Sequence, residues 1–422
     1  MSASVRVLIY ARILSGGRHG GIEQVVASLV HALGRLSDGQ EEYIILSDRR
    51  DSNWLKPFVG PNTSLVVRQP APILERARSI RRKPLYTAHR LWQHLCLHTI
   101  HRPLFATWLP ESDGYYESLG ADLVHFPIQS FARCNLPSIF NPYDLQHLHY
   151  PQFFSKVDFA IREIIYRAAC ATSRAVVVPS RWVKHDIVSQ YHIDPNKVYV
   201  SYLAPAAGAN SKLASADQSA PSPTIQLPET FAFYPAQTWP HKNHIRLLEA
   251  LALVRDRDNL IVNLVCTGRK NAFWLTIERQ ITRLRLENQV QFLGFVQSNE
   301  LQTIYRRARF VIHPSLFEGG GMPILEAFRE GVPVACSSVT SLTEYAGNAA
   351  LYFEPQSVES IATALERMML DDTLRAELRT RGATQLGGFT WETAAKTYRA
   401  LYRQVAGKVL ADEDRDLLRM AS

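Results

Sequence analysis

No apolar run in the 422-residue sequence approaches the roughly 20 residues needed to span a lipid bilayer, which excludes an integral membrane protein. The N-terminus lacks the basic start and small-residue cleavage site of a secretory signal, so a cytoplasmic protein is expected. Cysteines are few and scattered, with no spacing typical of a disulfide framework or a metal site, and are expected to be reduced core thiols. They are Cys96, Cys134, Cys170, Cys266 and Cys336.

Acidic residues are missing from Arg76 to Pro110, although this segment carries seven Lys and Arg residues. Because the whole chain has a net charge of +8, the remainder is nearly neutral. A charge confined to one segment predicts a local anionic partner rather than nucleic acid. The cations alternate with leucine and aromatic residues, as in helices that lie on an anionic membrane surface. A solvated face or an oligomer contact are the other interpretations.

Histidines also gather in this segment, at His89, His94, His98 and His101. No carboxylate or cysteine cluster accompanies them, so no metal site is expected.

The composition that is present, 46% hydrophobic and 20% charged, is that of a folded protein, and 422 residues suit two domains. Apolar runs alternate with segments of helical periodicity, which predicts βαβ units. The first run, residues 5–10, leads into the loop SGGRHGG, whose Gly20 and Gly21 open a helix or form a simple turn. The GxGxxG spacing of a dinucleotide-binding loop is absent after the first strand of either half, which excludes a dinucleotide oxidoreductase.

A change in amino-acid composition divides the chain into two halves. Residues 206–228 are rich in Ala, Ser and Pro and are predicted to be a linker. Residues 1–205 and 229–388 are each predicted to form a doubly wound α/β domain, with the two facing a cleft. Residues 389–422 have helical periodicity and no following strand, and the periodicity leaves open which domain they pack against.

The most informative segment is HPSLFEGGGMPILEAFREGVPVACSS, residues 313–338. A strand ends before three glycines, Gly319, Gly320 and Gly321, which are followed by Met322 and by Pro323 in the first turn of a helix. Such a helix presents free N–H groups and the positive end of its dipole to the cleft, where a phosphate can bind.

Two carboxylates, Glu318 and Glu326, bracket this turn with seven residues between them. Glu326 lies about one turn into the helix and points back toward its start, where it can accept hydrogen bonds from ribose hydroxyls. The plain alternative is a capping carboxylate and a surface glutamate, but the glycines, the proline and the preceding strand favour a site.

This segment resembles the E-x₇-E signature of the retaining glycosyltransferases of family 4 (glycosyl transferases group 1), and the similarity extends over nearly the whole chain. HGGIEQVVASLV, VVVPSRWVKHDIV, HKNHIRLLEAL, FLGFV and EYAGNAALYFEP occur in the order typical of that family. The resemblance implies a GT-B fold, with an N-terminal acceptor-binding domain and a C-terminal domain for a nucleoside-diphosphate sugar. It also implies that the C-terminal helix crosses back to the first domain.

The resemblance assigns roles to the residues of the donor site. Glu326 would bind ribose, Glu318 the donor-sugar hydroxyls, and the N–H groups of Gly321 and Met322 the diphosphate. Lys242 would neutralise the diphosphate as it leaves, although a surface lysine is the alternative. Phe295 would place its backbone beside the nucleobase, or would be a core aromatic. Gly20 and Gly21 would approach the diphosphate from the N-terminal domain.

The chain departs from the family pattern at two places. The arginine that usually precedes the lysine by five or six positions is absent, and Pro235, Ala236 and Gln237 stand there. Tyr143 occupies the position of a histidine near the donor sugar, before Asp144, which can also cap a turn. His147 could substitute for that histidine or be a structural residue.

The resemblance therefore implies a retaining, metal-independent glycosyltransferase that needs no cofactor. It would transfer a hexose or deoxyhexose to a glycan or lipid-linked acceptor in surface polysaccharide or glycolipid synthesis. The enzyme would be cytoplasmic and peripheral at the inner face of the cell membrane. A non-catalytic nucleotide-sugar-binding subunit is the alternative, suggested by Tyr143 and by the missing arginine.

Overall fold

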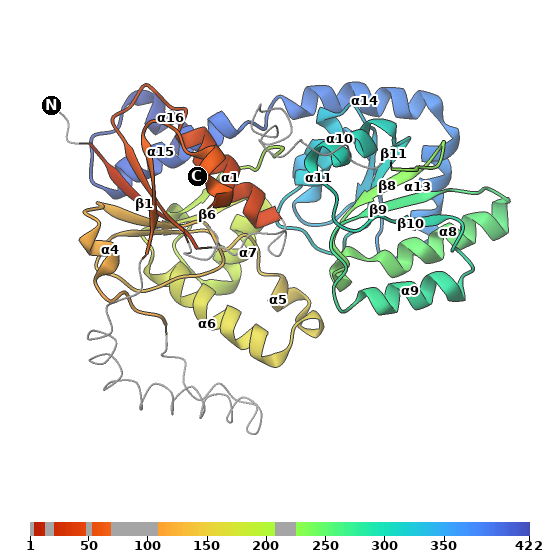
Figure 1. Cartoon of the computed structure of the whole chain (residues 1–422), viewed down its shortest axis with the longest axis horizontal. Helices are drawn as coiled ribbons and strands as arrows, with labels where there is room; N and C mark the ends of the chain where they lie inside the picture. The colour runs from red at the N-terminus through yellow and green to blue at the C-terminus, as the bar shows by residue number, and fades with distance from the viewer. Residues whose placement is uncertain (1–3, 13–20, 48–52, 69–108, 207–224) are drawn as a thin grey trace.

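A computed structural model describes residues 4–12, 21–47, 53–68, 109–206 and 225–422, which form two α/β domains (Figure 1). Gly20, most of the basic segment (residues 76–108) and residues 207–224 of the predicted linker lie outside the described residues.

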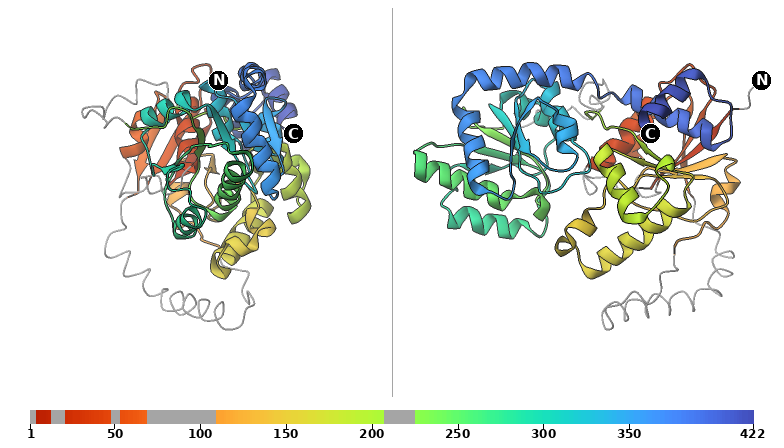
Figure 2. Two further views of the ribbon diagram at one scale, coloured as in Figure 1. Left: turned by 90° about the vertical axis from the view of Figure 1, so that its right-hand side faces the viewer. Right: turned by 180° about the vertical axis from the view of Figure 1, so that it is seen from behind.

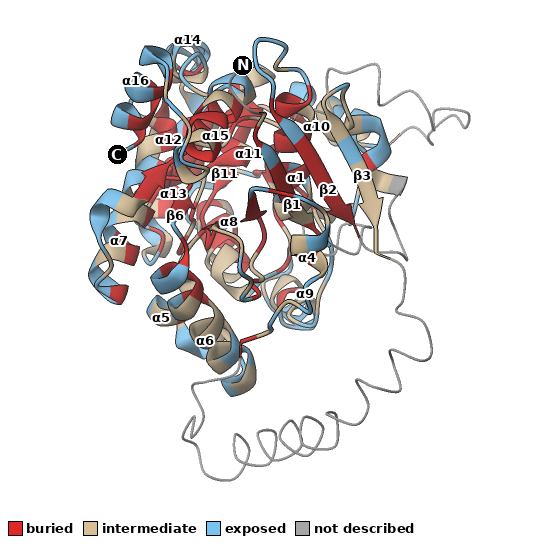
Figure 3. Ribbon diagram, turned by 90° about the vertical axis from the view of Figure 1, so that its left-hand side faces the viewer, coloured by how far each residue is buried: buried red, intermediate tan, exposed pale blue. Residues whose placement is uncertain are grey.

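The N-terminal domain is built on a seven-stranded sheet in which neighbouring strands are parallel, counted within the described residues. The strand order is β3-β2-β1-β4-β5-β6-β7. The strands are β1 (Arg6–Ala11), β2 (Glu42–Ser47), β3 (Thr63–Val67), β4 (Leu123–Phe126), β5 (Ser138–Phe140), β6 (Ala175–Val178) and β7 (Val198–Val200). Colouring by burial shows β1 and β2 as mostly buried, whereas the surrounding helices carry exposed residues (Figure 3).

The C-terminal domain repeats this arrangement in a six-stranded parallel sheet with the order β10-β9-β8-β11-β12-β13. Its strands are β8 (Ala232–Pro235), β9 (Leu264–Thr267), β10 (Val290–Phe292), β11 (Phe310–His313), β12 (Val334–Ser337) and β13 (Ala350–Phe353). In both sheets the first strand lies between the second and the fourth, which is the Rossmann-like order. Ligands bind at the carboxyl ends of strands in such sheets, where the order reverses.

Helices cover both faces of each sheet, because alternate strand residues point to opposite sides. Val7 and Ile9 belong to one core and Leu8 to another. The helices of the N-terminal domain are α1 (Gly21–Leu33), α4 (Tyr115–Ser118), α5 (Gln146–His149), α6 (Lys156–Thr172) and α7 (Arg181–Tyr191). Those that follow are α8 (His244–Asp258), α9 (Trp274–Arg283), α10 (Ser298–Arg307), α11 (Met322–Arg329), α12 (Leu342–Ala346), α13 (Val358–Leu370), α14 (Asp372–Leu386), α15 (Trp391–Val405) and α16 (Asp412–Ala421). Short 3₁₀ turns are η1 (Asn53–Phe58), η2 (Pro151–Phe153), η3 (Pro195–Lys197) and η6 (Pro240–Lys242).

The last two helices belong to the first domain. α15 and α16 lie beside α1 and β1 in Figure 1, and the view from behind shows the same neighbourhood (Figure 2). Tyr398, Leu401 and Tyr402 are buried in the core that contains β1 and α1. The expected return of the C-terminal helix to the N-terminal domain is therefore confirmed.

A second set of contacts joins the domains through Glu344 of α12. Its carboxylate accepts hydrogen bonds from the backbone N–H of Arg181 (2.9 Å) and of Trp182 (2.6 Å), the first residues of α7. The hydroxyl of Tyr202 donates to the same carboxylate at 3.0 Å. A helix N-terminus of one domain is thus capped by an acidic side chain of the other.

Helix α10 begins at Ser298, and the backbone N–H of the preceding Gln297 donates to the Glu300 carboxylate at 2.8 Å.

Candidate active site

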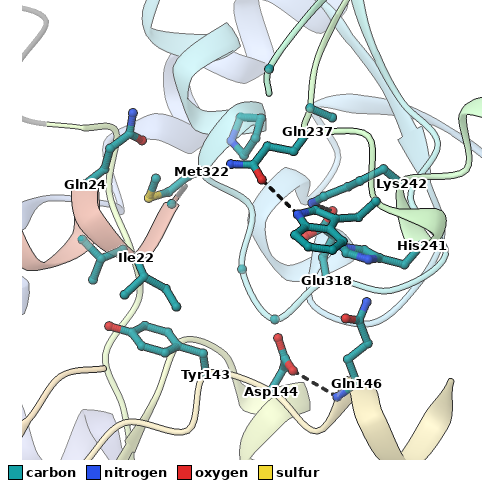
Figure 4. Close-up of a pocket in the computed structure, with 18 of the residues that line it drawn as sticks. Ile22, Gln24, Tyr143, Asp144, Gln146, Gln237, His241, Lys242, Glu318 and Met322 are labelled. Atoms are coloured by element: carbon teal, nitrogen blue, oxygen red, sulfur yellow. Dashed lines mark hydrogen bonds and ion pairs between the residues drawn. The ribbon is translucent and has the colours of Figure 1, made fainter. Parts of the chain in front are cut away.

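The two domains enclose a cavity of about 1,030 Å³. Residues of α1, α5 and α6 line its N-terminal side, and the loops after β8, β9, β10 and β11 line the other. Figure 4 shows Asp144 and Gln146 facing Glu318 and His241 across this space. Of the residues predicted for the site, the cavity contains Gly21, Tyr143, Lys242, Phe295, Glu318, Gly319, Gly320, Met322, Pro323 and Glu326.

The start of α11 opens into the cavity. The helix begins at Met322, Gly321 is its N-cap residue, and no side chain caps it. Its first N–H groups and the positive end of its dipole are therefore available to an anion. Gly321 itself is not among the residues that line the cavity. It packs closely against Tyr345, since a Cβ atom on Gly321 would lie 2.5 Å from the Tyr345 Cβ atom. A glycine is therefore needed here for close packing against Tyr345.

Lys242 and Glu318 form an ion pair in the part of the cavity wall that the C-terminal domain supplies. The Lys242 Nζ atom lies 2.6 Å from the Glu318 Oε1 atom, and the His313 Nε2 atom contacts the same oxygen at 3.1 Å. Burial would raise the pKa of Glu318, but the charge of Lys242 and the hydrogen bond from His313 hold that pKa well below its ordinary value. The carboxylate is therefore ionised, and within the described residues its Oε2 atom has no hydrogen-bond donor.

The turn that carries Lys242 is fixed from both ends. The hydroxyl of Tyr234 donates to the Lys242 carbonyl at 2.6 Å. Asn243 adopts a left-handed φ of 60°, and its amide donates to the carbonyls of Pro314 (3.0 Å) and Pro355 (2.8 Å). These hydrogen bonds tie the turn to the loops after β11 and β13. They therefore fix the backbone position of Lys242, from which its flexible side chain extends.

The backbone of Glu318 is held by two hydroxyl groups that the sequence analysis did not single out. The hydroxyls of Thr340 and Ser341 both donate to the Glu318 carbonyl at 2.8 Å, and the Glu318 N–H donates to the Thr340 Oγ1 atom at 3.1 Å. No spacing rule could have found them, since they act through the fold of the next loop.

Glu326 lines the cavity from one turn inside α11, as predicted, and is 6% exposed. The Tyr305 hydroxyl donates to its Oε2 atom at 3.0 Å. Burial raises the pKa of Glu326 above its ordinary value, against the lowering effect of Arg329 and of this hydrogen bond.

Phe295 is 71% exposed at the edge of the cavity, which rules out the core-aromatic interpretation. It follows Gly294, whose φ of 74° turns the chain out of β10. An exposed aromatic ring at the end of a strand can stack on a planar ligand group.

Tyr143 lines the cavity and is 8% exposed. Its hydroxyl donates to the Pro127 carbonyl at 2.7 Å, and burial raises its pKa well above the ordinary value, so the hydroxyl stays protonated. Its ring packs with Val25 and Met322 in a small apolar contact between the domains. The neighbouring Asp144 caps a turn, since its Oδ1 atom accepts from the Gln146 N–H at 3.0 Å.

The structure does not bring His147 to the cavity. The side chain is fully buried, its Nε2 atom lies 3.1 Å from the Glu163 Oε2 atom, and Phe159 and Tyr166 pack edge-on against its ring. The expectation that His147 replaces the missing histidine is corrected to a structural role, because helical periodicity alone could not tell which face of α5 meets the core.

Gln237 lies in the cavity where the family pattern has an arginine, and its side-chain oxygen accepts from the Trp239 indole N–H at 2.9 Å. A residue that the sequence analysis missed, Arg269, also lines the cavity from the loop after β9.

The described residues contain neither a cluster of metal-ligating side chains nor a helix that could span a membrane. No group of three or more His, Cys, Asp or Glu residues in these ranges is arranged to hold a metal ion, and the four clustered histidines lie outside them. Among the helices that the structure describes, none combines the length and the apolar character needed to cross a membrane.

The sequence is similar to those of known glycosyltransferases. A family model described as glycosyl transferases group 1 matches residues 216–385. The chain is 28% identical over 263 residues to O-antigen chain mannosyltransferase B of Escherichia coli, which covers 59% of this chain and 66% of that protein. It is 29% identical over 229 residues to O-antigen chain mannosyltransferase RfbU of Salmonella typhimurium, covering 54% and 59%. The chain thus spans less than two thirds of the length of either relative.

Solved structures share the fold over nearly the whole chain. HepE of Anabaena in complex with UDP and glucose superposes with a TM-score of 0.63 at 17% identity, covering 95% of this chain and 100% of that one. Sucrose-phosphate synthase of Thermosynechococcus elongatus gives 0.64 at 18% identity, covering 96% and 99%. The two Rossmann-like domains are the GT-B arrangement, and the C-terminal domain is similar to the glycosyl transferases group 1 family over residues 216–385.

Proposed function

We propose that the protein is a retaining glycosyltransferase that transfers a hexose from a nucleoside-diphosphate sugar to a glycan or lipid-linked acceptor during surface polysaccharide synthesis. The observation that carries the proposal is the uncapped start of α11 beside the Lys242–Glu318 pair in one interdomain cavity. The names of the two O-antigen mannosyltransferase relatives favour mannose as the sugar.

In this proposal the diphosphate of the donor binds at the start of α11, where helix dipole and free N–H groups favour negative charge. Lys242 has three donors, so it can keep Glu318 on one N–H and hold a phosphate oxygen with another. Glu318 accepts hydrogen bonds from sugar hydroxyls with its Oε2 atom, and Glu326 accepts them from the ribose. These contacts stabilise charge on the diphosphate as the sugar–phosphate bond breaks.

Retention follows from attack on the face that the diphosphate leaves. The bond between the anomeric carbon and the phosphate oxygen breaks as the acceptor oxygen forms its bond on the same face. The acceptor proton passes to the departing phosphate oxygen, so no side-chain base is required. The Tyr143 hydroxyl donates its hydrogen bond to the Pro127 carbonyl and takes no part in this scheme. Because the scheme needs no side-chain base, the tyrosine in place of the usual histidine has no catalytic consequence in it. The alternative of a non-catalytic subunit is not favoured.

Donor binding and transfer test the function. We expect a nucleoside-diphosphate hexose to raise the melting temperature in a panel of nucleotide sugars, since it binds only the folded protein. Incubation with an acceptor should give a product whose anomeric configuration, read by NMR, matches that of the donor. Tight donor binding without transfer or donor hydrolysis would establish the binding-subunit alternative, and an inverted product would contradict retention.

The raised pKa of Glu326 predicts an acid-sensitive donor site. Glu326 should protonate at a higher pH than an ordinary glutamate, so nucleoside-diphosphate affinity should begin to fall at a higher pH on acidification than it would with an ordinary glutamate. Tyr305→Phe removes a donor to the ionised form and should move the midpoint upward. Calorimetric titration measures both. A 2′,3′-dideoxy nucleotide lacks the ribose hydroxyls but has the same phosphates, so an identical pH profile for the two nucleotides would contradict the assignment.

Peripheral membrane binding is proposed for the basic segment, on the strength of its charge alone. Binding to acidic vesicles should fall steeply with salt and when Arg81, Arg82 and Lys83 are neutralised. A matched control neutralises three exposed arginines in and just after α9, Arg279, Arg283 and Arg285. Sedimentation with vesicles gives the readout, and equal losses in both variants would leave a solvated face as the interpretation.

A further inference from the structure

The charges around the cavity do not suit a diphosphate unless one more cation takes part. Among the described lining residues there are three lysine or arginine side chains and more carboxylates than cations. The carboxylates are Glu23, Asp144, Asp158, Glu318 and Glu326, and the cations are Arg162, Lys242 and Arg269. A nucleoside diphosphate adds two or more negative charges to this set, so each uncommitted cation matters.

Two of the three cations already have partners. The Lys242 ammonium is paired with Glu318 at 2.6 Å. The Arg162 guanidinium lies over the Phe154 ring, 5.1 Å from its centroid, and donates to the Tyr166 hydroxyl at 3.3 Å. Arg269 is exposed, and within the described part of the chain its guanidinium has no hydrogen-bond or ion-pair partner.

The loop of Arg269 is held against the loop of Lys242. The Ala236 N–H donates to the Thr267 carbonyl at 3.0 Å, and the Thr238 N–H donates to the Arg269 carbonyl at 3.3 Å. Gly268, at φ 116°, passes so close that a Cβ atom there would lie 2.5 Å from the Ala236 carbonyl oxygen. Arg269 thus extends from a backbone that other groups fix.

Strand order sets the sequence of groups along the cavity wall. The carboxyl ends of β9, β8 and β11 follow one another in the sheet, and they carry Arg269, Lys242 and the start of α11 in that order. Lys242 therefore lies between Arg269 and the helix terminus. The guanidinium is a planar fork of donors that suits phosphate oxygens.

We propose that Arg269 is the second cation of the donor site and binds the diphosphate of the nucleotide sugar beside Lys242. The inference rests on the proposed function and adds a residue to it. The charge of Lys242 is largely balanced by Glu318, so Arg269 supplies the positive charge that the diphosphate needs before and after the sugar leaves. Gln237, uncharged and bonded to Trp239, supplies none.

The neighbouring residue provides a matched control. The Lys270 Nζ atom lies over the Trp274 ring, 3.7 Å from its centroid, and is not among the residues that line the cavity. Arg269→Gln and Lys270→Gln therefore remove the same charge from adjacent exposed positions, one inside and one outside the proposed site.

Calorimetric titration with GDP, UDP and the corresponding nucleosides tests the proposal. Arg269→Gln should weaken binding of the preferred nucleoside diphosphate by roughly tenfold to a hundredfold, with nucleoside affinity and melting temperature unchanged. Arg269→Lys should keep part of the affinity, and Lys270→Gln should stay within about twofold of wild type.

The outcomes separate this proposal from the function on which it rests. If the wild-type protein binds neither diphosphate, the proposed function fails. If it binds one and Arg269→Gln binds it equally well, the role of Arg269 is overturned and the donor site stands. Equal losses for diphosphate and nucleoside would also overturn it, because they would place the guanidinium at the base.

Discussion

Lys242→Met should lower the melting temperature of the C-terminal domain by roughly 6–12 °C and reduce sugar transfer by about a hundredfold or more. The structural reason is the pair with Glu318. Both side chains are more than four-fifths buried, so removing the lysine leaves a buried carboxylate with His313 as its remaining contact. Breaking such a pair costs about 3 kcal/mol, because the uncompensated charge has lost its solvation.

The pH dependence of stability in the Lys242→Met variant provides an independent test of the ion pair. In the wild type the pKa of Glu318 lies below its ordinary value, so the stability that it contributes is present above the ordinary pKa and is lost as the pH falls through the lowered one. Without Lys242, burial dominates and raises this pKa. Lys242→Met should therefore regain stability relative to wild type on mild acidification, when Glu318 becomes neutral.

The double variant Lys242→Met/Glu318→Gln is the control. It removes both charges, so no unpaired charge stays buried and most of the melting temperature should be recovered. Transfer should stay low, because the charge of Lys242 is still missing. Melting curves and initial transfer rates are the measurements. A double variant that regains transfer, or a Lys242→Met protein that melts and reacts like the wild type, would contradict the assignment.

The sequence was enough to predict the parts of the site that one continuous segment determines. The strand, the three glycines, Pro323 and the helix of the E-x₇-E segment lie next to each other, and each residue type has a local reason. The position of Glu326 one turn into α11 follows from helical geometry alone. Local rules also predicted the alternating strands and hence both sheets.

Contacts between distant segments could not be predicted in this way. Lys242 and Glu318 are 76 residues apart, and Glu344 caps α7 from 162 residues away. Arg269 follows an ordinary strand and carries no local signal, so the order of the strands in the sheet was needed to bring it to the site. The prediction for His147 was wrong for a different reason. Histidine is a common catalytic residue, but this side chain faces the core and not the cavity.

Gly319→Ala should reduce sugar transfer by roughly a hundredfold while the C-terminal domain still binds nucleoside diphosphate. A Cβ atom at this position would lie 2.5 Å from the Tyr143 carbonyl oxygen, across the contact between the domains, whereas ordinary contact begins at 3.4 Å. Tyr143 cannot yield, because its ring is buried and its hydroxyl is held by Pro127 at 2.7 Å. The domains must then separate by about 1 Å, which misplaces acceptor against donor.

Two controls isolate this contact. A Cβ atom on Gly320 would meet the Leu203 Cδ1 atom at 2.8 Å, the end of a flexible side chain, so Gly320→Ala should lose less than tenfold. Tyr143→Phe keeps the carbonyl and loses one hydrogen bond, so transfer should fall only in part. Transfer rates, nucleotide titrations and melting curves are compared for all three. If Gly319→Ala also loses the nucleotide, the glycine acts on the donor; if it reacts as fast as Gly320→Ala, transfer does not need the domains to meet at Tyr143.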